Sequence, residues 1–82
     1  MDTHRTLEAG RNRSLKLIRK GKALRVWIAS DADRAFAESI ETAAAAAGLS
    51  PDRTKTGRQI AEMCRVEVFT AVAVEKNSDT DS

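Results

Sequence analysis

Residues 25–48 read RVWIASDADRAFAESIETAAAAAG and place two different patterns one after the other. The segment 25–29 is short, apolar and rich in β-branched and aromatic residues, which is typical of a buried strand. In segment 34–47 the apolar residues recur at the 3.6-residue period of an α-helix, at Phe36, Ile40, Ala43, Ala44 and Ala47. Asp31 and Asp33 stand between the two segments and are predicted to cap the helix. The stretch therefore predicts a strand followed directly by a helix, a unit from which α/β folds are built.

A second strand and helix are expected upstream of this unit. Segment 6–10 is predicted to form a short strand or extended lead-in that a glycine breaks. Segment 11–20 then carries three apolar residues among basic ones, which suits a short amphipathic helix. Gly21 follows two cations, and this order is usual at the end of a helix.

Downstream, the pattern continues with one weak and two clear elements. Segment 49–54 lies where an alternating fold places another strand, but Pro51 allows only an edge strand or a loop. Thr56 and Gln59 have the spacing of a capping box and predict the start of a short helix. Its inner face is expected to hold Ile60, Met63 and Cys64. Segment 66–74 is β-branched and is predicted to be the final strand.

The length of 82 residues accommodates one domain, which we expect to span residues 1–76, with a disordered polar and acidic tail over 77–82. Strands that alternate with helices predict a small α/β sandwich with a mostly parallel or mixed sheet.

The composition disfavours most enzyme classes. A single cysteine, Cys64, and a single histidine, His4, leave little material for a disulfide framework, a zinc site or a nucleophile with its base. The longest alanine run, Ala43–Ala47, is far shorter than the roughly 20 apolar residues that span a bilayer. The N-terminal residues have no apolar segment typical of a secretory signal. We therefore expect a cytoplasmic binding module, without cofactor, metal or membrane partner.

The positive charge is concentrated in the first third of the chain. Residues 1–26 hold eight Lys or Arg against two acidic residues, a balance of +6, although the whole chain carries only +2. Such a distribution predicts one electropositive face that attracts polyanions. Within it, Asn12 and Lys16 share a helical face with Arg13 at its edge, where their side chains could meet base edges. Arg19 and Lys20 are better placed for backbone phosphates.

Three segments carry a resemblance to a known family. They are the run from Gly10 through Lys16 to Lys20-Gly21, the strand and Asp-Ala-Asp corner at 26–33, and the late segment 64–74. In these segments the chain resembles the kink-turn RNA-binding ribosomal proteins of the L-seven-Ae and L-thirty-e type, in particular their short bacterial members. The resemblance covers about residues 5–75, in order and without gaps.

This resemblance implies a three-layer α/β/α sandwich with a small central mixed sheet that grips a sharply bent RNA internal loop. The helix start would read tandem sheared G·A pairs, and the late loop would pack on an extruded nucleotide. The implied RNA-binding residues are Gly10, Arg11, Asn12, Arg13, Lys16, Arg19, Lys20, Val66, Glu67 and Val68. The implied partner is a kink-turn or related internal loop, such as one of ribosomal RNA. The implied protein is a bacterial, cytoplasmic monomer associated with the ribosome or another ribonucleoprotein.

The chain departs from the family pattern at several positions. Arg13 replaces a glutamate or glutamine, so a cationic donor stands where the family has an acceptor. Ala61, Arg65 and Phe69 stand where short bacterial members often carry glycine, which affects the expected shape of the late loop. Phe69 also offers a stacking surface for a base.

Two other functions remain open on the sequence alone. Residues 59–72 imitate a helix-turn-helix DNA-binding module, although Arg65 occupies the turn and segment 66–74 is unusually β-branched for a recognition helix. The alanines Ala43–Ala47 would suit a protein-interaction or ribosome-assembly scaffold without base readout. Asp31 and Asp33 resemble a catalytic or metal-binding pair, but helix capping explains them with fewer assumptions.

Overall fold

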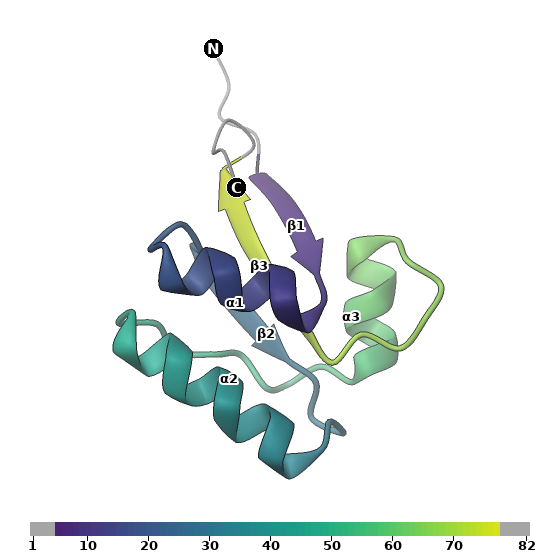
Figure 1. Cartoon of the computed structure of the whole chain (residues 1–82). Coiled ribbons are helices and arrows are strands. Elements are labelled where there is room, and N and C mark those ends of the chain that lie inside the picture. Colours follow the sequence, from purple (N-terminus) through teal and green to yellow (C-terminus); the bar gives the residue numbers. More distant parts are fainter. Residues whose placement is uncertain (1–4, 78–82) are drawn as a thin grey trace.

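The computed structural model describes residues 5–77, and residues 1–4 and 78–82, with His4 and most of the expected tail, lie outside this range. The described chain contains three strands and three helices (Figure 1). In chain order these are β1 (Arg5–Ala9), α1 (Arg11–Arg19), β2 (Arg25–Ile28), α2 (Arg34–Ala46), α3 (Gly57–Cys64) and β3 (Val72–Asn77). The two strand–helix units predicted for the first half of the chain are confirmed to within about two residues at each end.

The last strand, β3, lies at the centre of the sheet, in the order β1-β3-β2. It pairs antiparallel with both neighbours: Leu7 of β1 lies opposite Glu75, and Val26 of β2 lies opposite Val74. The three-stranded sheet is therefore antiparallel, and the expectation of a mostly parallel or mixed sheet is wrong: within residues 5–77 the parallel pairing amounts to an isolated bridge between Trp27 and Asp52 beside β2. Segment 49–54 thus contributes a single bridge and otherwise runs as a loop, in agreement with the restriction that Pro51 imposes.

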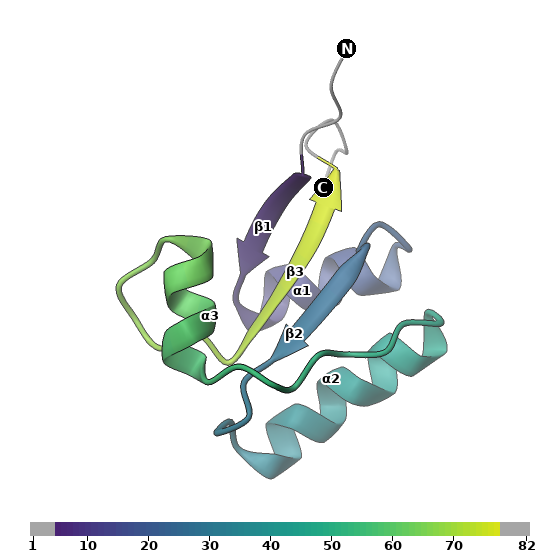
Figure 2. The same ribbon diagram turned by 180° about the vertical axis from the view of Figure 1, so that it is seen from behind.

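The helices cover the two faces of the sheet and form three layers. Alternate side chains of the sheet, including Val26 and Val74, pack in one apolar cluster with α1 and α2. Trp27 and Ala73, which point to the opposite face, pack in a second cluster with Ile60 of α3. Accordingly, α1 lies in front of the sheet in Figure 1 and behind it in Figure 2. The fold is the α/β/α sandwich implied by the sequence resemblance.

The prediction of one continuous final strand over 66–74 is wrong in its first half. Residues 66–71 form a loop, and β3 begins at Val72 and continues to Asn77. Thr70 in this loop bonds outside the sheet, since its N–H donates to the Gly57 carbonyl at 3.2 Å and its hydroxyl to the Val68 carbonyl at 3.1 Å. β-Branched residues were therefore a poor indicator of strand here, because the valines of the loop lie on the protein surface.

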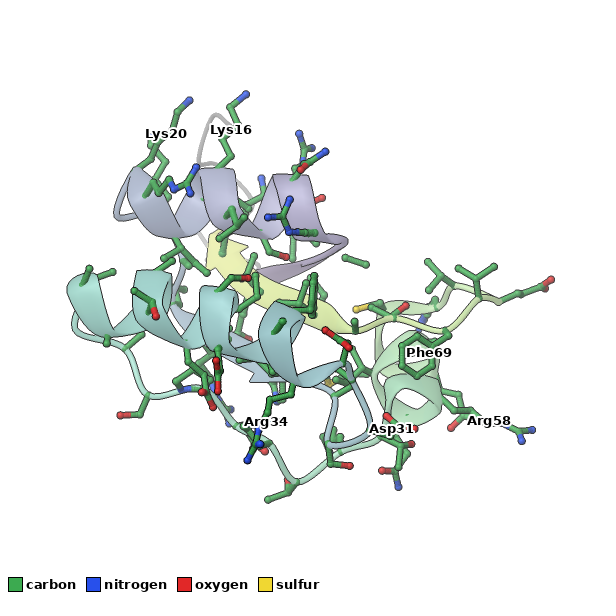
Figure 3. The ribbon with its side chains drawn as sticks, turned by 60° about the horizontal axis from the view of Figure 1, so that its bottom comes forward. Lys16, Lys20, Asp31, Arg34, Arg58 and Phe69 are labelled. Carbon is green, nitrogen blue, oxygen red and sulfur yellow. The ribbon has the colours of Figure 1, made fainter. Side chains whose placement is uncertain are left out.

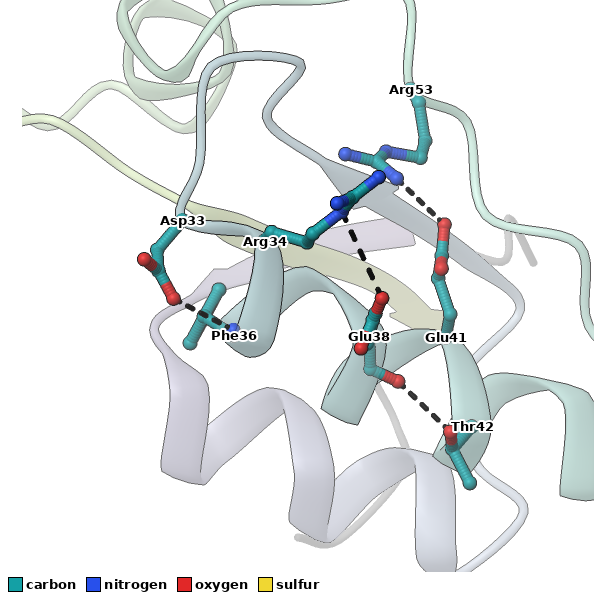
Figure 4. A network of polar contacts seen from close by, with 7 residues as sticks. All are labelled: Asp33, Arg34, Phe36, Glu38, Glu41, Thr42 and Arg53. Carbon is teal, nitrogen blue, oxygen red and sulfur yellow. Dashed lines mark hydrogen bonds and ion pairs between the residues drawn. The ribbon is translucent and has the colours of Figure 1, made fainter.

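The two aspartates that precede α2 cap two different helices. The carboxylate of Asp33 accepts a hydrogen bond from the Phe36 N–H at 3.1 Å and caps α2, as predicted (Figure 4). The carboxylate of Asp31 instead accepts from the Gly57 N–H at 2.9 Å and thereby satisfies the first residue of α3. The predicted capping box of α3 is present in full between Thr56 and Gln59. Asp31 and Asp33 are therefore accounted for as structural residues.

Candidate nucleic-acid interface

The exposed face of α1 carries a row of cations. Lys16 and Lys20 project from it away from the body of the protein (Figure 3). A hollow of about 360 Å³ on this face is lined by Arg11, Asn12, Leu15, Lys16, Arg19 and Lys20. Five of the predicted site residues are thus brought together on one helix face. Asn12 is available on this face, because Gly10 and not Asn12 is the N-cap, and its side chain has no hydrogen-bond partner among residues 5–77.

The start of α1 also presents unsatisfied backbone donors. Gly10 has a φ of 106°, a backbone conformation that residues other than glycine rarely adopt. This conformation lets the chain turn from β1 directly into α1. No side chain caps α1, and its first turn contains no acidic residue. The first intrahelical bond is donated by the Ser14 N–H, so the N–H groups of the three preceding residues point out of the helix end. Together with the helix dipole, this end favours an anion.

The loop 65–71 lies beside the start of α1. The Gly10 N–H donates to the carbonyl of Val72 at 3.1 Å, which ties the turn before α1 to the end of the loop. A hollow of about 350 Å³ between them has Gly10 and Arg11 on one side and Val66, Val68 and Phe69 on the other. The structure therefore brings Val66 and Val68 next to the helix start. Glu67 is not part of this hollow; it lines a second one, of about 540 Å³, between the loop and α3.

The loop exposes apolar side chains to solvent. Val68 is 70% exposed and Phe69 is 57% exposed, which is unusual for such large apolar groups. The ring of Phe69 nevertheless packs directly against Gly57, the first residue of α3. A β-carbon built on Gly57 would lie only 2.5 Å from the ring atoms Cδ2 and Cζ, so the ring occupies the space that a side chain would fill. One side of the ring is therefore used to cover Gly57, while more than half of the side chain remains accessible.

Arg65 shows how the loop keeps its shape without the expected glycine. It ends α3 in the left-handed conformation, with φ 61° and ψ 40°, in which glycine is usual. Behind it, the Val66 N–H donates to the Ala61 carbonyl at 2.9 Å and closes the helix end. The missing glycine thus adds strain at Arg65 and does not abolish the turn.

Replacing this residue is expected to relieve the strain. Arg65→Gly should raise the free energy of unfolding by about 1 kcal/mol, because glycine has no β-carbon to oppose the left-handed conformation. The measurement is urea unfolding followed by circular dichroism. Ala47→Gly is the matched control, since Ala47 ends α2 with a φ of −94° and should lose stability on the same change. A neutral or destabilising Arg65→Gly would contradict the assigned strain.

Arg13 does not point freely into the basic face. Its Nε donates to Glu8 Oε1 of β1 at 3.1 Å, and Lys76 Nζ of β3 lies 3.8 Å from the other carboxylate oxygen. The side chain of Lys76 is only 9% exposed, whereas that of Arg13 is 45% exposed. On the sequence alone Glu8 counts only as a charge. Its contact with Arg13 depends on the sharp turn at Gly10 from β1 into α1, and its contact with Lys76 depends on the pairing of β1 with β3.

Cys64 and Trp27 lie in surroundings that indicate a structural role for both side chains. Burial raises the pKa of the Cys64 thiol, and Glu8 raises it further, so the thiolate is disfavoured. Trp27 is buried, as predicted, under the guanidinium of Arg25, which lies 4.9 Å from the ring centroid.

Among residues 5–77 there is no cluster of three or more histidine, cysteine or acidic side chains able to hold a metal ion. Within the same range, no helix has the length and apolar character needed to cross a bilayer.

The helix-turn-helix interpretation is not favoured by the fold. It requires a recognition helix after Arg65, but residues 66–71 form a loop and residues 72–77 the central strand of the sheet. The segment that would enter the DNA groove is therefore partly an exposed loop and partly a strand buried between two helical layers, and it forms no recognition helix.

The fold and this surface define a class: a small α/β/α sandwich that presents a basic helix and an apolar loop at one end of its sheet. No family model and no curated protein sequence matches the chain. Among solved structures, the 15.5kD RNA binding protein of Giardia lamblia is similar to it, with a TM-score of 0.79 and 29% identity over 90% of this chain. The chain covers 62% of that protein's chain. This similarity supports the family resemblance that the sequence motifs indicate.

Proposed function

We propose that this chain binds structured RNA and recognises a sharply bent internal loop of the kink-turn kind. The observation that carries the proposal is the hollow in which the uncapped start of α1 meets the exposed apolar loop, between Gly10 and Arg11 on one side and Val66 and Val68 on the other. A site that combines anion-binding amides with an apolar surface suits an RNA whose backbone turns sharply and whose bases leave the stack. The description of the similar Giardia lamblia structure as an RNA binding protein supports the same class of ligand.

In this proposal the basic face of α1 contacts the RNA backbone and the helix start meets the bases. Lys16 and Lys20 project from the helix, and Arg19 lines the same hollow, so all three can neutralise phosphates; this releases counterions and supplies much of the affinity. Asn12, at the second position of the helix, can donate and accept on a base edge because the protein does not use its amide.

The loop 65–71 supplies the apolar part of the recognition. Val66 and Val68 would pack on a nucleotide that has left the stack, with Phe69 adding an aromatic surface. Glu67 lines the hollow on the other side of the loop, so it is assigned to the rim and not to the contact with the helix start.

The proposed partner in the cell is ribosomal RNA or another RNA of a ribonucleoprotein particle, bound by a monomer in the bacterial cytoplasm. The site is proposed to act by shape-selective binding alone, and no cofactor or chemical step is assigned to it.

The test is a salt-varied binding titration against three fluorescent ligands: a kink-turn RNA, a straight RNA duplex and a DNA duplex. The kink-turn RNA is expected to bind most tightly and to keep its preference as the salt concentration rises, because shape-specific contacts are not screened. The control is the same RNA with its G·A pairs replaced by Watson–Crick pairs, which has the same charge and cannot adopt the bend. Equal binding to all ligands, lost together in salt, would contradict the proposal.

A further inference from the structure

Arg13 is the position of the basic helix where the structure holds a side chain in one orientation. Its Nε donates to Glu8 Oε1 at 3.1 Å, and the side chain of Glu8 is itself only 21% exposed. The second oxygen of Glu8 lies 3.8 Å from Nζ of the nearly buried Lys76. Lys76 of the central strand β3 thus holds the carboxylate of Glu8 on the edge strand β1. This carboxylate in turn holds the guanidinium of Arg13 in the first turn of α1.

The contact with Glu8 uses one of the five N–H donors of the guanidinium. The terminal nitrogens keep four donors in a planar fork, on a side chain that is 45% exposed. A fork of this geometry recognises either a phosphate or the O6 and N7 atoms of guanine. Because the guanidinium is already oriented, less conformational entropy is lost when it binds.

The carboxylate beside Arg13 decides between these two ligands. Arg13, Glu8 and the nearly buried Lys76 together carry one net positive charge, but Glu8 is the charged group in direct contact with Arg13, so its carboxylate would repel a phosphate bound at the fork. A guanine edge is uncharged and offers two acceptors, so it can use the fork without that repulsion. The neighbouring Arg11, Lys16 and Arg19, which have no acidic partner among residues 5–77, are better suited to phosphates.

We infer that Glu8 and Lys76 are positioning residues that aim Arg13 at the O6 and N7 atoms of a guanine in the bound RNA. This inference rests on the proposed RNA-binding function and assigns a guanine reader within the same site.

The experiment compares kink-turn RNAs in which single guanines are replaced by 7-deazaguanine, which lacks the N7 acceptor. For the wild-type protein, replacement at one of the sheared guanines is expected to lower the affinity by about 10-fold, whereas replacement in the flanking duplex should have no effect. In Glu8→Ala the same replacement is expected to cost less than about 2-fold, since an arginine that is no longer oriented gains little from N7. Glu8→Gln, whose amide oxygen can still accept from Arg13 Nε, should keep most of the wild-type penalty.

The readout is a ratio of two affinities measured on one protein, so a loss of folded fraction in Glu8→Ala cancels. A Glu8→Ala protein as sensitive to 7-deazaguanine as the wild type would overturn the role of Glu8, and a wild-type protein insensitive at every guanine would overturn the role of Arg13. If kink-turn RNA is preferred in both cases, the proposed function stands and only this inference fails. If the wild type does not distinguish kink-turn RNA from a straight duplex, both fail.

Discussion

Lys16→Glu is expected to lower the affinity for kink-turn RNA by about 100-fold, because it removes a charge-assisted contact worth about 1.5–3 kcal/mol and adds repulsion. Lys16 lies in the middle of the basic face of α1 and projects away from the protein (Figure 3). No ion pair holds it among residues 5–77, so its substitution should leave the fold intact. The measurement is a fluorescence-anisotropy titration, together with urea unfolding to verify stability.

The control for Lys16→Glu is a charge reversal elsewhere. Arg53→Glu changes the net charge equally, but Arg53 lies in the segment between α2 and α3, where its Nη1 donates to Glu41 Oε2 at 2.8 Å (Figure 4). It should reduce RNA affinity much less than Lys16→Glu, through long-range electrostatics alone. Equal losses in the two variants would mean that net charge, and not the face of α1, determines binding. Unchanged affinity in Lys16→Glu would remove this face from the interface.

Phe69→Ala is expected to lower the affinity for the same RNA by about 5- to 150-fold, which corresponds to the loss of one base–aromatic stack of about 1–3 kcal/mol. The side chain is more than half exposed and rests on Gly57 at the first turn of α3, so its ring is available in a fixed position. Because little of the ring contributes to the core, the free energy of unfolding should change far less than the affinity.

Two further variants separate stacking from general apolar contact. Leu24→Ala removes an exposed apolar side chain, 39% accessible, that follows α1 and lies outside the loop, and it should leave RNA binding unchanged. Gly57→Ala keeps the phenylalanine but places a methyl group where the ring lies, so it should displace the ring and reproduce much of the loss. An RNA that lacks the base of the extruded nucleotide should make wild type and Phe69→Ala bind alike. Persistence of the difference with that RNA would contradict stacking.

Much of the fold was predictable from local patterns. The helical period of 34–47, the capping box at Thr56 and the apolar segment 25–29 each correspond to an observed element. These signals are reliable because helix periodicity and capping depend on residues within one or two turns of each other. The prediction failed at 66–71, where β-branched residues lie in an exposed loop, because strand formation depends on pairing with segments distant in the sequence.

The candidate site likewise has features that local sequence patterns predict and features that only the structure reveals. The cations of α1 could be placed on one face from their spacing alone, and the structure gathers them on one hollow. By contrast, no local pattern indicated that Asp31 would cap α3, that Phe69 would rest on Gly57 or that Arg13 would bond to Glu8. The first two contacts join segments that are distant in the sequence, and the third depends on the sharp turn at Gly10 between β1 and α1.

By itself, the sequence determined which segments are helical, where they are capped and that the first third of the chain is basic, since these properties follow from neighbouring residues. Only the tertiary structure decided that the last strand enters the centre of the sheet, between β1 and β2. This insertion holds the loop 65–71 beside the start of α1 and brings Lys76 under Glu8. The order of strands in a sheet is set by long-range burial and pairing, so the interface between helix and loop exists only once the chain has folded.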